Sequence, residues 1–291
     1  MSEGEFVTEV ISDEDPQVAR IIIDGYVDSP QEARRYLESA LKQWPRNMKV
    51  IFTITPGGFI TIEPNEKFEG YKVADFSDAD IKALIDESKD AVYKVLISSL
   101  RKKLASKTKY LTIGADVFHS KLRGTVPHME LVHVYDTAKN KIVHTTGKSY
   151  PTMDQARTLI PFRDLGSHFK SFDRKSVCIL GCHDLNMVSP RSIASLTKGS
   201  EKSKTIKEFN TLMKKHSPSI LLHHPHTTDT PRIWQTAIAG LKKNHPYVGS
   251  FYSAGTYYNG RKPVRDDLDK VLDATRTGDT IDFVVTYEEA Y

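Results

Sequence analysis

The chain has 291 residues, of which 39% are hydrophobic and 27% are charged, with 41 Lys and Arg against 37 Asp and Glu. This apolar content and this small charge imbalance exclude a disordered chain and a fibrous repeat. Two cysteines are too few for a disulfide scaffold, and a net charge of +4 without a concentrated basic stripe argues against a nucleic-acid binder.

The N-terminal residues are acidic. Six Asp and Glu lie between Glu3 and Asp15, so residues 1–19 are predicted to form a flexible polar segment. No apolar run approaches the roughly 20 residues of a membrane helix, and the first residues lack a basic and then apolar leader. A cytoplasmic protein that does not engage membranes is therefore expected.

The first half of the remaining chain predicts strands that alternate with helices. A run of isoleucines forms the first buried strand, and Asp28-Ser29-Pro30 supplies a helix cap with proline in the first turn. A later long helix shows apolar residues at helical spacing. The predicted elements cover residues 21–23 (strand), 30–43 (helix), 50–54 (strand), 59–62 (strand) and 78–100 (helix).

The second half predicts a strand, a hairpin and further alternation. The hairpin turn is Asp136-Thr137-Ala138-Lys139-Asn140. No composition break marks a second domain, so residues 20–291 are predicted to form one α/β domain with a mixed sheet. Strands are predicted at residues 110–117, 130–135, 142–144, 177–181, 220–223 and 247–251, and helices at residues 204–215 and 231–243.

Reactive chemistry is expected where the strand over residues 177–181 ends. Cys178 lies inside this strand and is predicted to be core, whereas Cys182 follows its last residue. In α/β sheets the carboxyl ends of strands form sites, and a thiol placed there can meet a substrate. Taken alone, Cys182 is better interpreted as a small buried apolar side chain, and its neighbours in the sequence change that interpretation. Gly-rich phosphate loops and HExxH are absent, which argues against those nucleotide and zinc sites.

The segments around Cys182 resemble the nitrilase, or carbon–nitrogen hydrolase, superfamily over roughly residues 20–285. Cys182-His183-Asp184 is similar to the family's Cys-Tyr-Asp nucleophile segment, and Lys148 follows the hairpin 34 positions upstream, as the family's lysine does. The strand, helix and strand predicted downstream follow the family's order. The resemblance implies a four-layer α-β-β-α sandwich with mixed sheets and a homo-oligomer.

The resemblance also implies a mechanism without a metal or cofactor. Cys182 would attack the carbon of a small amide or nitrile, and Lys148 would stabilise the developing oxyanion by its charge. A glutamate would move the proton, and water would hydrolyse the thioester. A cation beside Cys182 would also lower the pKa of its thiol.

The family's glutamate is missing from its usual place. Gly57 and Gly58 stand there, after Pro56, and Glu63 is the replacement that the sequence offers. The departure leaves two interpretations open: a divergent hydrolase, or a nitrilase fold that binds a ligand without catalysis.

Histidines gather near the ends of two predicted strands. The predicted substrate-binding residues are His183, Asp184, His224, His226 and Arg232. A metal-dependent hydrolase built on these histidines is a third hypothesis. It is less favoured, because His223 and His224 are adjacent in a strand and point to opposite faces.

Overall fold

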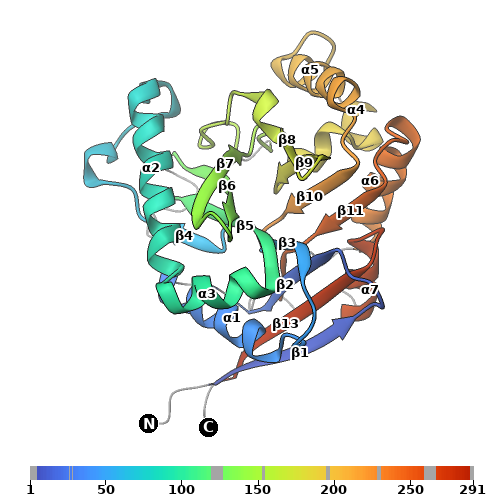
Figure 1. Cartoon of the computed structure of the whole chain (residues 1–291). Coiled ribbons are helices and arrows are strands. Elements are labelled where there is room, and N and C mark those ends of the chain that lie inside the picture. Colours follow the sequence, from blue (N-terminus) through green and yellow to red (C-terminus); the bar gives the residue numbers. More distant parts are fainter. Residues whose placement is uncertain are drawn as a thin grey trace.

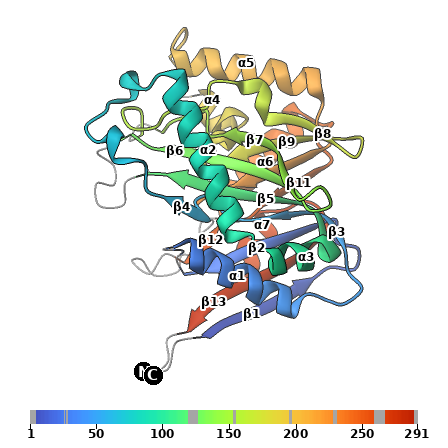
Figure 2. The ribbon, with the colours of Figure 1, turned by 60° about the vertical axis from the view of Figure 1, so that its left-hand side comes forward.

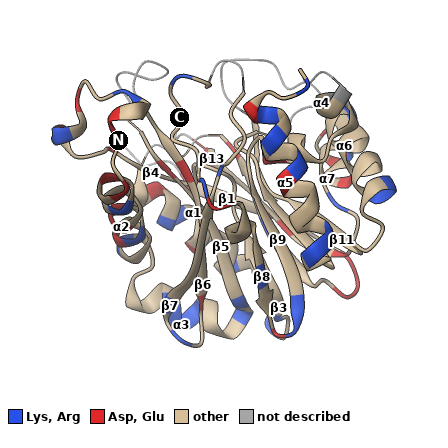
Figure 3. Cartoon of the chain, turned by 90° about the horizontal axis from the view of Figure 1, so that it is seen from above, with Lys and Arg blue, Asp and Glu red and all other residues tan. Residues whose placement is uncertain are grey.

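Two β-sheets lie face to face between two layers of helices in the computed structural model, as Figure 3 shows from above. The structure describes residues 5–25, 27, 29–118, 127–152, 155–194, 197–227, 231–258 and 267–288. The layer order confirms the predicted α-β-β-α sandwich with mixed sheets. No helix in these ranges is long and apolar enough to cross a membrane.

The larger sheet has nine strands in the order β1-β13-β2-β3-β5-β6-β7, and β12 and β4 pair with β2 and β5. It is parallel from β13 to β5 and antiparallel at both ends. Its strands are β1 (Glu5–Ser12), β2 (Val18–Asp24), β3 (Val50–Ile54), β4 (Ile60–Ile62), β5 (Thr108–Val117), β6 (Met129–Asp136), β7 (Lys141–Gly147), β12 (Thr256–Tyr258) and β13 (Thr280–Glu288).

The smaller sheet has four strands in the order β11-β10-β9-β8. The first three are parallel, and β8 pairs antiparallel with β9. Its strands are β8 (Phe169–Phe172), β9 (Lys175–Gly181), β10 (Ile220–His224) and β11 (Ser250–Ser253). The parallel order brings the carboxyl ends of β9 and β10 to the same edge, which is where Cys182 and His226 follow.

Helices cover the outer face of each sheet. Figure 2 shows α1 (Pro30–Gln43), α2 (Asp78–Val95) and α3 (Ser98–Lys107) across the larger sheet. Figure 1 shows α5 (Glu201–His216) and α6 (Pro231–Asn244) on the side of the smaller sheet. Two further short helices are α4 (Pro190–Ala194) and α7 (Leu268–Ala274). The helix predicted over residues 78–100 is two helices, because the chain turns at Leu96–Ile97.

The period-two alternation of apolar residues builds three core layers. In β2, Ile21 and Ile23 pack against the helices, whereas Ile22 faces the smaller sheet. In β9, Ile179 faces the larger sheet, whereas Cys178 packs toward the outer helices and is fully buried. The core interpretation of Cys178 is therefore confirmed.

The prediction of a flexible segment over residues 1–19 is wrong for the residues that the structure describes. Glu5–Ser12 forms edge strand β1, whose Glu5 lies opposite Glu288 of β13 in an antiparallel ladder. Phe6 and Val10 pack against the core beneath α1. The polar composition concealed this strand, since its partner is at the other end of the chain.

Candidate active site

The inner face of the larger sheet changes from apolar to polar at the ends of β5, β6 and β7. Along β6, Val134 and Val132 face the smaller sheet, and Glu130 continues this face. Asp116 of β5 lies directly opposite Glu130 in the ladder, and Lys148 follows β7 and donates its backbone N–H to the Glu130 carbonyl at 2.8 Å. Pairing register therefore places three charged residues in one row.

Lys148 and Glu130 form a buried ion pair within this row. The Lys148 Nζ donates to Glu130 Oε1 at 2.8 Å and to Gln155 Oε1 at 2.6 Å, and both charged side chains are almost fully buried. Burial alone would raise the pKa of Glu130, but the charge of His226, a hydrogen bond from His128 and the Lys148 ammonium lower it well below its usual range. Glu130 is therefore a carboxylate at neutral pH.

Cys182 stands at the carboxyl end of β9, opposite the row. Its carbonyl oxygen accepts a hydrogen bond from His223 Nε2 at 2.8 Å, which fixes the backbone of the turn. Its Sγ accepts the backbone N–H of His226 at 3.5 Å. Burial alone would raise the pKa of the Cys182 thiol, but the His226 charge and hydrogen bonds from His183 and His226 together lower it to about 6. A substantial thiolate fraction at neutral pH follows.

His226 connects the thiol to the charged row. Its Nε2 lies 2.6 Å from Asp116 Oδ2, its Nδ1 lies 3.9 Å from Glu130 Oε2, and its side chain is about one-third exposed. Burial would lower the pKa of His226, but Asp116, Glu130 and the Cys182 thiolate raise it well above its ordinary value. His226 is therefore an imidazolium in the resting site.

Three buried polar atoms of this cluster have no hydrogen-bond partner in the described protein: Asp116 Oδ1, Glu130 Oε2 and His183 Nδ1. Buried polar atoms are normally paired, so unpaired ones at a site indicate where water or a ligand binds. The cluster therefore has bonding capacity left for a substrate.

Asp184, predicted to bind substrate, is occupied by backbone hydrogen bonds. It is fully buried, its Oδ1 accepts the backbone N–H groups of Ser149 and Tyr150 at 2.9 and 2.8 Å, and its Oδ2 accepts that of Gly181 at 3.0 Å. Asp184 thus joins the segment after Lys148 to the end of β9, which positions both predicted catalytic residues.

His224, also predicted to bind substrate, is buried, and its Nε2 has no hydrogen-bond partner among the described residues. It is 1% exposed, and its Nδ1 donates to the Thr55 carbonyl at 2.7 Å, on the face toward the larger sheet. His223 points the other way, with Nδ1 3.0 Å from Ser253 Oγ. Burial lowers the pKa of His223 to about 3 and that of His224 to about 4, so both are neutral. Opposite orientation along β10 is as predicted.

Arg232 and Glu63 lie on the exposed surface. Arg232 is in the first turn of α6, and Glu63 directly follows β4. The predicted proton shuttle needs a buried carboxylate beside the thiol and the ammonium. The carboxylates that contact Lys148 and His226 are Glu130 and Asp116, so the role given to Glu63 stays a prediction and the structure offers buried alternatives.

No group of three or more His, Cys, Asp or Glu among the described residues is arranged to hold a metal ion. Three of these histidines bond other groups: His223 bonds the Cys182 carbonyl and Ser253, His224 bonds the Thr55 carbonyl, and His226 bonds Asp116.

Sequence reasoning missed Asp116 and Glu130. Both lie in runs that read as apolar strands, and their signal is an acidic residue at the period-two positions that otherwise face the core. The signal can be interpreted only when the pairing of β5 with β6 is known, because that pairing places Asp116 opposite Glu130.

No protein-family model and no curated protein matches the sequence. A double mutant of an amidase from Nesterenkonia sp. AN1 in complex with acrylamide is similar at 11% identity and a TM-score of 0.47, over 88% of this chain and 78% of that one. Glutamine-dependent NAD+ synthetase from Acinetobacter baumannii is similar at 12% identity and a TM-score of 0.43, over 86% and 38%. These values describe a general likeness, and the site's own geometry carries the functional argument.

Proposed function

We propose that the protein is a thiol-dependent hydrolase that cleaves a non-peptide carbon–nitrogen bond through a thioester on Cys182. The observation that carries the proposal is the contact of the Cys182 thiol with His226 at a strand end, in a site where its pKa is about 6. A low thiol pKa at a partly exposed position is the property of nucleophilic cysteines.

Lys148 is the proposed oxyanion stabiliser. An ammonium has three N–H donors, and those of Lys148 bond Glu130 and Gln155, which leaves one for a developing oxyanion. The Glu130 carboxylate keeps this buried cation paired. The substrate class proposed is a small amide or nitrile, and no cofactor takes part.

The alternative of a ligand-binding protein without catalysis rested on the missing glutamate. A carboxylate 2.8 Å from Lys148 and the His226 imidazole beside Cys182 can supply the proton transfer that the missing glutamate performs in the family. This arrangement supports the hydrolase over the binding protein.

The test is incubation with a panel of small amides and nitriles, followed by mass spectrometry of the intact protein and assay of released ammonia. We expect an acyl adduct on Cys182, and a loss of turnover of at least about a thousandfold in Cys182→Ala. Cys178→Ala is the matched control, because Cys178 is buried on the outer face of the same sheet. Full turnover by Cys182→Ala would refute the proposal.

A further inference from the structure

We propose that His226, held by Asp116, is the general acid and base of this site, so that Cys182, His226 and Asp116 form one proton relay. The inference rests on the proposed function. It assigns a catalytic role to His226, which the sequence predicted to bind substrate, and to Asp116, for which the sequence predicted no role.

The geometry gives each ring nitrogen of His226 a separate task. Nε2 lies 2.6 Å from Asp116 Oδ2, so the carboxylate fixes the proton on this nitrogen and orients the ring. Nδ1 lies 3.9 Å from Glu130 Oε2, and the His226 side chain is within hydrogen-bond reach of the Cys182 thiol, whose Sγ also accepts the His226 backbone N–H at 3.5 Å. A side chain about one-third exposed also leaves room for a substrate to reach the ring.

Gly58 leaves space for the relay. It adopts a positive φ of 64°, and a Cβ built on it would lie 3.0 Å from both Asp116 Oδ2 and His226 Cδ2. That is tighter than ordinary side-chain contacts, so a larger residue would displace the hydrogen bond between Asp116 and His226. The loop over residues 55–58 therefore approaches the Asp116–His226 pair as closely as a glycine allows.

The other carboxylate of the cluster is less suited to moving protons. Glu130 Oε1 is bound by the Lys148 ammonium, and the low pKa of this carboxyl makes it a weak base and rarely an acid. Its unpaired Oε2 lies 3.9 Å from His226 Nδ1, from where its charge supports the imidazolium.

The relay accounts for every proton transfer in the hydrolysis of an amide. In the resting state Cys182 is a thiolate and His226 is an imidazolium. The sulfur attacks the carbonyl carbon of the amide and forms a bond to it. As the carbon–nitrogen bond breaks, the imidazolium gives its Nδ1 proton to the leaving nitrogen. Neutral His226 then takes a proton from water, whose oxygen attacks the thioester. Collapse releases the acid and restores the thiolate and the imidazolium.

The relay is tested by the pH dependence of Cys182 alkylation by iodoacetamide, which needs no substrate. The charged and titratable groups around the thiol and the ring are His226, His183, Asp116, Glu130 and Lys148. In His226→Gln we expect the thiol pKa to rise from about 6 to at least its ordinary value of about 8.5. Alkylation at pH 7 then slows by about tenfold or more.

Asp116→Asn is the second variant, because it retains the size of the side chain. It removes the charge that favours the imidazolium, so the thiol pKa is expected to rise by less than in His226→Gln. His216→Gln, at an exposed site on α5, is the matched control and leaves the profile unchanged. Turnover is expected to fall about 10²–10⁴-fold in His226→Gln.

The two proposals fail separately. An unchanged thiol pKa in both His226→Gln and Asp116→Asn overturns the relay, even when Cys182 is essential. Activity retained in Cys182→Ala overturns the hydrolase proposal instead. A raised thiol pKa together with lost turnover in His226→Gln supports both.

Discussion

Asp184 is the residue on which the geometry of the site depends most. Its carboxylate accepts three backbone N–H groups, two from the segment after Lys148 and one from the last residue of β9. Backbone donors of this kind, buried without a partner, each cost about 1–3 kcal/mol. One fully buried side chain therefore holds together two segments that sequence separates by more than thirty positions.

Asp184→Ala is expected to lower the free energy of unfolding by about 3–5 kcal/mol, because it leaves three N–H groups unpaired. Asp184→Asn is expected to cost less, since its amide oxygen still accepts from Ser149 and Tyr150 while its NH2 faces the Gly181 N–H. Urea unfolding followed by circular dichroism measures both. Equal stability of Asp184→Ala and the wild type would contradict this account.

The sequence placed Cys182 and Lys148 at the ends of predicted elements, but it gave no indication of the side chains that they meet. Cys182 follows the last residue of β9, and Lys148 follows β7 and donates to Glu130. The partners of these residues depend on register, and Asp116 meets Glu130 only because two antiparallel strands align at those positions. Local patterns carry no information on that alignment.

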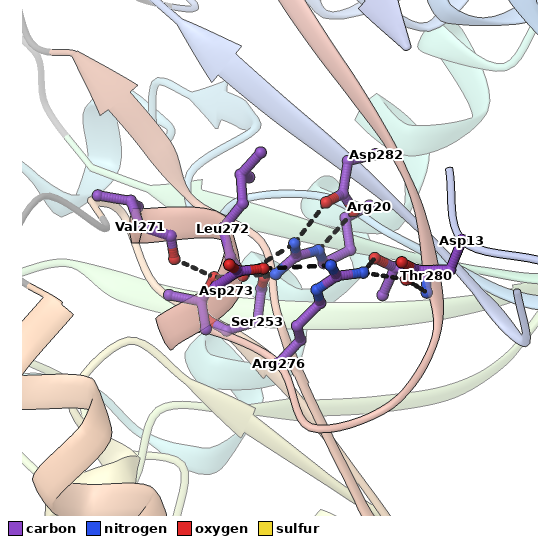
Figure 4. A network of polar contacts seen from close by, with 10 residues as sticks. Asp13, Arg20, Ser253, Val271, Leu272, Asp273, Arg276, Thr280 and Asp282 are labelled. Atoms are coloured by element: carbon purple, nitrogen blue, oxygen red, sulfur yellow. Dashed lines mark hydrogen bonds and ion pairs between the residues drawn. The ribbon is translucent and has the colours of Figure 1, made fainter. Parts of the chain in front are cut away.

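At the scale of elements, β2 and β13 are joined by a buried ion pair. Arg20 donates to both carboxylate oxygens of Asp282, which lies beside it in Figure 4. Its guanidinium also donates to Thr275 Oγ1 and to the carbonyl oxygens of Ser253 and Leu272. The Arg20 and Asp282 side chains are at most 1% exposed. The ion pair joins β2, near the start of the chain, to β13, near its end.

Arg20→Met is expected to destabilise the protein by about 3–5 kcal/mol, because it leaves the Asp282 carboxylate buried without its cation. The double variant Arg20→Met/Asp282→Leu removes both charges and is expected to recover most of that loss. Thermal unfolding of the single and double variants measures the coupling. A double variant less stable than Arg20→Met would contradict the expectation.

Helices and buried strands were predicted well, whereas the strands at the ends of the chain were not. Ser29 caps α1 through the Glu32 N–H at 3.2 Å, and the helix spans Pro30–Gln43 as expected. β13 passed unnoticed, although it lies between β1 and β2 in the larger sheet. A helix is specified by its own caps and periodicity, but a strand at a terminus is specified by partners far away.

At the scale of the whole molecule, neutral histidines are part of the core. His133 lies between α2 and β7, where its ring bonds Ser88 and, at 2.9 Å, Thr145. Burial lowers the pKa of His133 to about 3, with smaller contributions from Lys89 and His144. His223 and His224 share this state at the inter-sheet edge. On the outer helices, Figure 3 shows charged residues of both signs on α2 and α5.

These buried histidines predict a loss of stability in mild acid. Their pKa values are lowered in the folded protein, so they favour folding fully above the unfolded pKa of about 6.5. Below that pH the histidines are protonated in the unfolded chain but stay neutral in the folded chain. The free energy of unfolding therefore falls by about 1.4 kcal/mol per pH unit for each histidine. The raised pKa of His226 acts oppositely, because its contribution is lost as pH rises.

The free energy of unfolding in urea is therefore expected to fall steeply between pH 6 and pH 5, by up to about 4 kcal/mol from three histidines. His133→Gln is expected to be less stable at pH 7 and also to show a slope smaller by about one proton. The slope separates titration from lost packing, because a packing defect lowers the free energy of unfolding by the same amount at both pH values. His216→Gln, at an exposed position, is the control and keeps the wild-type slope. If His133→Gln also keeps it, His133 is not a neutral core residue whose protonation opposes folding.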